Sequence, residues 1–239
     1  MNQSYLYLLI NTGTILFPFL FSFESRVRYV NWWKWLFPSM FITALVFLTW
    51  DQIFTVNGVW GFNDRYITGA HFMNLPIEEI LFFFTVPYAS IFIYAFTNTI
   101  WPDTPTLDKY ANKISYAMLT IALILLVANY NKAYTALNCG YAVVLLCIQL
   151  FLVKGTYMGK FYRFYLWHLI PFFIVNGMLT GWGIAEEVVW YNNHENIGIR
   201  MGTIPIEDSL YSFSLMLMNI MLIEGFKSRL KKKNALIGA

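Results

Sequence analysis

Long apolar stretches alternate with short polar connections along the whole chain. Each stretch holds the roughly 20 mostly apolar residues that a helix needs to cross a hydrocarbon core about 30 Å thick. Inside lipid, backbone N–H and C=O groups find partners only within the segment itself, so each span is predicted to be helical. The seven predicted spans are 4–22, 35–54, 76–96, 114–131, 134–153, 162–181 and 205–224.

Composition agrees with this pattern. The chain has 239 residues, of which 58% are hydrophobic and 12% are charged. A typical soluble domain carries about 25% charged residues to cover its surface, so an ordinary soluble domain is excluded. We expect an all-α integral membrane protein that crosses the cell membrane several times, with the lipid bilayer as its solvent.

Basic residues gather in every second connection. If the N-terminus is outside, 13 of the 16 Lys and Arg residues fall in the inner connections and the C-terminal tail. Because cytoplasmic loops carry the excess of Lys and Arg, the predicted topology is N-out and C-in, with an odd number of helices. The basic tail KSRLKKK favours contact with anionic lipid headgroups, and no nucleic-acid partner is predicted. The outer connections contain only Arg65, Lys132 and Arg200.

An internal repeat divides the chain. The segment starting at Phe62 aligns without gaps on the segment starting at Tyr191, so one constant offset relates every matched pair. The repeat predicts two three-helix units, 1–113 and 133–239, joined by a connector helix at 114–132. An odd connector leaves both units pointing the same way, as in parallel transporter repeats, so equivalent motifs should lie at the same outer face. The matched pairs are Asn63/Asn192, Gly69/Gly198, Pro76/Pro205, Ile77/Ile206, Glu78/Glu207, Glu79/Asp208, Leu81/Leu210 and Phe84/Phe213.

Each half contains a proline followed by two acidic residues at the start of an apolar helix. Pro76 and Pro205 suit the first turn, where a missing N–H costs nothing. The acids that follow lie at or just inside the hydrocarbon boundary, where ionisable residues are costly and mark functional sites. A simpler alternative is that they only interact with the helix dipole.

Only one acid of each pair can point directly at the bundle axis, because successive helical residues are about 100° apart. Glu78 and Glu207, the position that is Glu in both halves, are predicted to face inward, with Glu79 and Asp208 as orienting partners. A carboxylic acid in dry, aromatic surroundings stays protonated near neutral pH and can act as a general acid. The sequence has no metal-ligand cluster, Gly-rich phosphate loop or dinucleotide fingerprint, so no metal or cofactor is predicted.

At these motifs the sequence resembles the membrane lycopene cyclases of the heterodimeric type, in their fused single-chain form. That family carries one Pro-x-Glu-(Glu/Asp) motif per half, and the resemblance covers essentially the whole chain. The second half has Gly181-Trp182 near the position of Trp50-Asp51 in the first half, so Glu186 or Glu187 is a candidate for the missing acid. The remaining residues that carry the resemblance are Phe62, Asn63, Tyr191, Asn192, Arg200, Gly202 and Thr203.

The resemblance implies a redox-neutral cyclisation of the ψ-ends of a linear carotenoid, lycopene, to β-rings, by way of gamma-carotene to beta-carotene. A carboxylic acid protonates the terminal double bond, the internal double bond attacks the cation, and a base removes a ring proton. Glu78 and Glu207 are the implied acids, with Glu79, Asp208 or Asp51 as candidate bases. The residues expected to bind or orient the substrate are Asp51, Trp60, Asn63, Pro76, Phe83, Tyr191, Asn192, Arg200 and Pro205.

Other residues near the motifs also have simpler explanations. His168, in the sixth span, is expected to be a buried, hydrogen-bonded histidine. Arg65 and Arg200 precede the two acidic motifs and pair either with the motif carboxylates or with Asp64 and Glu195 in solvent. Aromatic residues near the motifs can stabilise a cation, although packing also explains them; they are Trp60, Phe82, Phe83, Phe84, Trp190, Tyr211 and Phe213.

Three other functions share parts of this pattern. A proton-coupled transporter of small molecules can have the same plan of three helices, a connector and three helices. A carotenoid hydratase would form the same cation and admit water. A retinal-binding photoreceptor needs a lysine in the last helix, and residues 205–224 contain none, which excludes it. The oligomeric state stays open, with a homo-oligomer as one alternative.

Overall fold

Seven α-helices, joined by short strands and loops, make up the described part of the protein. The computed structural model describes residues 3–237, with side chains up to residue 230. Lys231, Lys232 and Lys233 of the basic tail therefore lie outside the described side chains. The helices are α1 (Leu6–Leu20), α2 (Trp33–Val56), α3 (Ile77–Ile100), α4 (Pro105–Ala128), α5 (Ala133–Cys147), α6 (Met158–Leu179) and α7 (Glu207–Ile237).

Each predicted span falls largely within one helix. The two largest differences are at α7, which ends at Ile237 rather than at residue 224, and at α4, which begins at Pro105 rather than at residue 114. The start of α4 has a local explanation. Its first turns carry charged and polar side chains, so the apolar pattern marks only the later part of the helix. Pro105 occupies the first turn, where its fixed φ and missing N–H favour a helix start.

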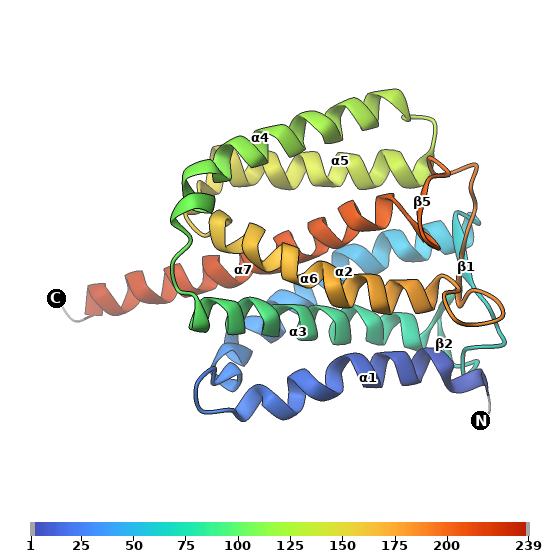
Figure 1. Ribbon diagram of the computed structural model, residues 1–239, viewed down its shortest axis with the longest axis horizontal. Helices are drawn as coiled ribbons and strands as arrows, with labels where there is room; N and C mark the ends of the chain where they lie inside the picture. Colours follow the sequence, from blue (N-terminus) through green and yellow to red (C-terminus); the bar gives the residue numbers. More distant parts are fainter. Residues whose placement is uncertain (1–2, 238–239) are drawn as a thin grey trace.

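Six of these helices are long and apolar enough to cross a membrane. Among the described helices α6 is the exception, because Arg163, His168 and Asn176 interrupt its apolar run. It nevertheless packs against α3 and α4 within the bundle (Figure 1). The predicted all-α membrane fold is confirmed, while the number of spans and the N-out orientation stay predictions.

Both acidic motifs lie at the same end of the bundle. In Figure 1, α1, α3, α5 and α7 all run away from the end that holds the strands, and α2, α4 and α6 run back toward it. α3 begins directly after Pro76, and α7 begins two residues after Pro205. α1 packs against α3, and α5 packs against both α4 and α7. The first turns of α3 and α7 therefore face a common region beneath the strands.

Short antiparallel strand pairs close that end of the bundle. The strands are β1 (Trp60–Phe62), β2 (His71–Phe72), β3 (Leu75–Pro76), β4 (Val189–Tyr191), β5 (Arg200–Met201) and β6 (Ile204–Pro205). β2–β3 and β5–β6 are hairpins at equivalent positions of the repeat. β1 and β4, also equivalent, pair with each other and place Gly61 opposite Trp190. Gly61 and Trp190 are equivalent positions of the repeat, so a local two-fold axis passes between them.

Aromatic side chains fill the bundle between α2, α5 and α7. Phe47 and Trp50 of α2 pack edge-on against Tyr141 of α5, with ring centroids 5.2 and 5.0 Å apart. Tyr211 of α7 contacts the same two rings at 5.2 and 5.6 Å. Aromatic pairs at such distances add about 0.5–1.5 kcal/mol each beyond the burial of their area. These rings therefore fill the part of the bundle between Phe47, Tyr141 and Tyr211.

The close approach of β1 and β4 requires glycine at position 61. A Cβ atom added there would lie 2.3 Å from the Trp190 ring, so Gly61→Ala should lower the free energy of unfolding by about 1–3 kcal/mol through overpacking. Thermal unfolding of the purified protein in detergent measures this loss. In a Trp190→Ala background the same substitution should cost much less. An unchanged unfolding temperature in the single variant would contradict the pairing of β1 with β4.

Candidate active site

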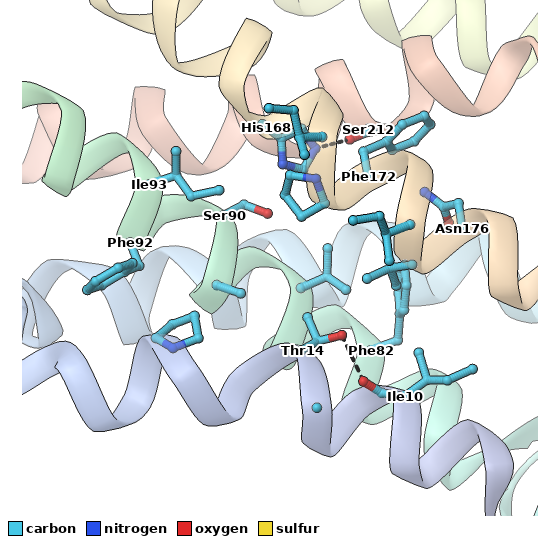
Figure 2. A pocket seen from close by; sticks show the side chains of 18 of the residues that line it. Ile10, Thr14, Phe82, Ser90, Phe92, Ile93, His168, Phe172, Asn176 and Ser212 are labelled. Carbon is cyan, nitrogen blue, oxygen red and sulfur yellow. Dashed lines mark hydrogen bonds between the residues drawn. The ribbon is translucent and has the colours of Figure 1, made fainter.

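A large cavity lies between α1, α3 and α6 and ends against α7 and the β1–β4 pair. Its volume is about 1420 Å³, above the roughly 300–1,000 Å³ of ordinary small-molecule sites. It follows α1 from Leu6 to Phe21, a helical length of about 22 Å, so it can hold a long apolar chain. Figure 2 shows part of its wall: Ile10 and Thr14 of α1, Phe82, Ser90, Phe92 and Ile93 of α3, and His168, Phe172 and Asn176 of α6.

The cavity opens sideways between α1 and α6. Leu9 and Phe17 of α1 line it and are exposed, as are Ile170 and Ile174 of α6. α3 lies between these two helices in Figure 1 and forms the floor of the cavity. Because the rim between α1 and α6 is apolar in a membrane-embedded bundle, this opening faces lipid. Glu24 and Arg26 line the cavity at the end far from the strands.

Glu79 and Asp208, one acid from each half of the chain, line this cavity at its strand end. Glu79 is 8% exposed and Asp208 is 5% exposed. Trp60 and Tyr211 also line the cavity in this region. A buried ionisable group is costly unless it is paired or hydrogen-bonded, so the partners of each acid decide what it can do.

Glu79 is held by a phenol and lies against a second carboxyl group. Tyr7 of α1 donates a hydrogen bond to Oε2 of Glu79 at 2.5 Å. Asp51 of α2 makes a direct side-chain contact with Glu79, and its Oδ1 accepts a hydrogen bond from Trp60 Nε1 at 2.7 Å. Oδ2 of Asp51 is buried and accepts no hydrogen bond of ordinary geometry from the described residues, although the Thr55 hydroxyl also lies near Asp51. Two touching carboxyl groups satisfy each other only when one carries a proton, so this geometry suits a pair that shares one.

Asp208 is held by two phenols. Tyr134 of α5 donates a hydrogen bond to Oδ1, and Tyr191 of β4 donates one to Oδ2 at 3.1 Å. Burial, followed by the negative charge of Asp208, raises the pKa of Tyr191 well above its usual range, so the phenol remains a donor. Because each Asp208 oxygen accepts a hydrogen bond, these contacts suit an ionised carboxylate.

Glu78 and Glu207 face the loops rather than the cavity, which reverses the orientation predicted from the sequence. Oε1 of Glu78 accepts a hydrogen bond from the backbone N–H of Thr68 at 2.8 Å. Oε1 of Glu207 accepts one from the N–H of Ile197 at 2.6 Å and another from Thr135 at 2.7 Å. Thr68 and Ile197 are themselves equivalent positions of the repeat. The two glutamates therefore anchor equivalent loops, which gives both halves the same reason to have Glu at this position.

Two tyrosines and two asparagines that were not predicted from the sequence support the acids. Asn11 donates a hydrogen bond to the backbone carbonyl of Glu78 at 3.0 Å, and Asn138 donates one to that of Glu207 at 2.7 Å. With Tyr7 and Tyr134 they form a Tyr-x3-Asn-x-Gly pattern present in both α1 and α5. The offset between these two copies is slightly shorter than the offset between the acidic motifs, so an alignment at one fixed offset does not detect them.

Some of the residues predicted to bind or orient the substrate reach the site, and others shape the loops. Trp60 and Tyr191 line the cavity. Asp51 does not line it, but its side chain contacts Glu79, which does. Asn63 and Asn192 instead accept hydrogen bonds from backbone N–H groups two residues further on, each at 3.1 Å. These two asparagines therefore stabilise equivalent turns, as Asx side chains commonly do.

The prolines and Phe83 act as structural residues. Pro76 and Pro205 each end a hairpin strand just before a helix, and Pro76 is extended, with φ −64° and ψ 148°. Phe83 is buried in the core beside Phe47, whereas the preceding residue, Phe82, lines the cavity.

The charged residues near the two acidic motifs do not line the cavity, although the Arg200 guanidinium lies 5.7 Å from the centre of the Tyr191 ring. Arg200 donates hydrogen bonds to the Thr203 carbonyl at 2.8 Å and to Asn193 at 2.9 Å. Arg65 lies 3.5 Å from Glu186 in an exposed ion pair. Glu186 and Glu187 are both exposed, so neither supplies the acid that the second half lacks at the position of Asp51.

His168 of α6 is a buried, hydrogen-bonded histidine, as predicted. Its Nε2 lies 2.6 Å from the hydroxyl of Ser212 of α7 (Figure 2), and the residue is 2% exposed. The pair adds a polar spot to the cavity wall, where Ser212 lies one helical turn along α7 from Asp208.

The sequence of the chain also matches a known protein family. The family model described as Lycopene cyclase matches residues 4–97 and 131–226, which together make up more than half of the chain. The first range contains Tyr7, Asp51 and Glu79, the second contains Tyr134 and Asp208, and α4 lies between the two ranges. No curated protein and no solved structure matches the chain.

Glu78→Ala and Glu207→Ala should each weaken the fold, because each leaves the backbone N–H of an anchored loop without its partner. The expected loss is about 1–3 kcal/mol of unfolding free energy, measured by thermal unfolding of the purified protein. Glu187→Ala, an exposed carboxylate in the same region, serves as the control and should change stability by no more than about 0.5 kcal/mol. Wild-type stability in both glutamate variants would show that they do not anchor the loops.

Proposed function

Since the chain belongs to the lycopene cyclase family, we propose that it closes β-rings at both ψ-ends of lycopene, by way of gamma-carotene to beta-carotene, in the cell membrane. Ring closure is an isomerisation in which every atom of the end group stays in the product, so it requires no redox cofactor. The observation that carries the proposal is the placement of two acids, Glu79 and Asp208, at one end of a long apolar cavity.

Glu79 is the proposed proton donor. It lines the cavity and belongs to the carboxyl pair whose geometry suits a shared proton. Transfer of that proton to the terminal carbon–carbon double bond forms a C–H bond and leaves a tertiary carbocation on the neighbouring carbon. The pair then carries one more negative charge, which Tyr7 and Trp60 stabilise through their hydrogen bonds to Glu79 and Asp51. General acid catalysis of this kind contributes about 10²–10⁴-fold in rate.

Aromatic rings surround the position where the cation forms. Trp60 lies 5.2 Å from Tyr134 and 6.1 Å from Tyr191 between ring centroids, and all three line the cavity. A cation over an aromatic face gains roughly 0.5–2 kcal/mol per ring, more when the site is dry. The internal double bond of the end group attacks the cation, which forms the ring bond and moves the positive charge into the new six-membered ring.

Asp208 is the proposed base. Held as a carboxylate by Tyr134 and Tyr191, it accepts a proton from the ring carbon next to the new cation. The electron pair of that C–H bond becomes the double bond of the β-end. Return of the proton from Asp208 to the Asp51–Glu79 pair resets the site, so no net proton is consumed.

Exclusion of water favours ring closure over hydration. Water would trap the carbocation as an alcohol, which is the outcome expected of a carotenoid hydratase. The cavity wall is mainly apolar, with Ile10, Phe82 and Phe172 among its residues, and its opening faces lipid. These features support a cyclase rather than a hydratase.

Expression in cells that accumulate lycopene, followed by chromatography of the pigments, tests the proposal. Ringed products with the mass of lycopene are expected. Hydroxylated acyclic products would replace the cyclase with a hydratase. Unchanged pigment, with the protein present in the membrane, would contradict catalysis and favour a transporter.

Glu79→Gln and Asp208→Asn should each lower ring formation by about 100-fold or more, because one removes the acid and the other removes the base. Both substitutions keep side-chain size, so the amount of protein in the membrane and its unfolding temperature should stay near the wild-type values. Ring formation is measured per amount of protein, with Glu186→Gln as the control at an exposed carboxylate. Near wild-type turnover in Glu79→Gln or in Asp208→Asn would remove that residue from the mechanism.

A further inference from the structure

We infer that the two halves of the chain build one reaction chamber, not two, and that both ends of the substrate are cyclised in it one after the other. Glu79 comes from the first half and Asp208 from the second, and both line the cavity beside α1. The inference rests on the proposed function. It adds that the substrate must leave after the first ring closure and return with its other end foremost.

The corresponding space beside α5 is filled. Thr14 of α1 lines the cavity (Figure 2), and its counterpart is Tyr141 when α1 is aligned on α5 through the shared Tyr-x3-Asn-x-Gly pattern. The Tyr141 ring packs against Phe47 and Trp50 of α2, where a second chamber would need open space. α4 covers α5 from another side. The repeat therefore leaves a chamber at one of the two equivalent places and closes the other with aromatic rings.

A smaller space between α5 and α7 cannot serve the same reaction. It measures about 320 Å³ and is lined by residues such as Leu145, Met218 and Arg229, with no carboxyl group among its described lining residues. It also lies toward the C-terminal end of α7, whereas Glu207 and Asp208 are in the first turn of that helix.

The shape of the chamber explains how a long substrate is handled. The acids lie at the closed end, and the opening between α1 and α6 faces lipid. An acyclic end can enter from the side, while the rest of the polyene lies along α3 or remains in the membrane. Only one end can reach Glu79 and Asp208 at a time, so a product with a single ring is released between the two closures.

Two equivalent glycines provide a matched test. Gly13 lines the chamber. Gly140 occupies the equivalent position of α5 and is not among the residues that line the chamber. A Cβ atom added at either position meets no heavy atom within 4 Å. Gly13→Phe should therefore fill the chamber, and Gly140→Phe places the same side chain at the equivalent point of α5, away from the residues that line the chamber.

Each variant is supplied separately with lycopene and with the carotenoid that has one ring, so that the two closures are measured independently. Gly13→Phe should slow both closures by about tenfold or more through overpacking of the chamber, and Gly13→Ala should have a smaller effect on both. Gly140→Phe should leave both within about twofold of wild type, as expected for a site away from the chemistry. Membrane content and unfolding temperature identify any folding defect.

If Gly140→Phe slowed either ring closure as much as Gly13→Phe does, the proposal of a single chamber would be overturned. A Gly13→Phe variant that loses one closure and keeps the other, the result expected of one chamber per half, would overturn it too. Failure of the proposed function has a different signature, because the wild-type protein would then form no rings from either substrate.

Discussion

Carboxyl groups from both halves of the chain are buried at one end of an apolar cavity, and the remaining structure depends on how their charge is accommodated. An unpaired buried carboxylate costs several kcal/mol. Each acid therefore accepts hydrogen bonds from other elements of the fold: from Tyr7 of α1 for Glu79, and from Tyr134 of α5 and Tyr191 of β4 for Asp208. These contacts join helices that lie far apart in the sequence. The requirement to satisfy two acids therefore also fixes how α1, α3, α5 and α7 meet.

The internal repeat gives both halves of the chain the same arrangement of helices and loops. The residues that differ between the halves give each half its own part in the proposed chemistry. Both halves anchor a loop with a glutamate and tie its carbonyl to an asparagine. Tyr7 and Tyr134 also donate to equivalent acids, but Glu79 lies against Asp51 while Asp208 is held by a second phenol, Tyr191. The two halves also differ at Thr14 of α1 and the equivalent Tyr141 of α5: Thr14 lines the cavity, whereas the Tyr141 ring packs against α2. The first half thus provides a carboxyl pair suited to donate a proton, and the second half provides a carboxylate suited to accept one, in a cavity that helices from both halves line.

The sequence alone predicted the helices, the repeat and the acidic motifs, because apolar stretches of fixed length and a long ungapped alignment are strong signals. It did not predict which acid of each pair faces the cavity. Which acid faces the cavity depends on the backbone N–H groups of the preceding loop, which donate hydrogen bonds to Glu78 and Glu207 and hold them away from it. No local sequence pattern encodes the path of that loop. Tyr7 and Tyr134 were missed because their spacing differs from that of the motifs. The weaker apolar character of α6 follows from Arg163, His168 and Asn176.

The proposed roles require that Glu79 and Asp51 share a proton before the reaction while Asp208 is ionised, and infrared difference spectroscopy of the protein in lipid can detect that proton. A protonated carboxyl group has a carbonyl stretch that a carboxylate lacks. At neutral pH we expect such a band in the wild-type protein, its loss in Glu79→Gln and its persistence in Asp208→Asn. A protonated band that survives Glu79→Gln and disappears in Asp208→Asn would show that the acid and the base are exchanged.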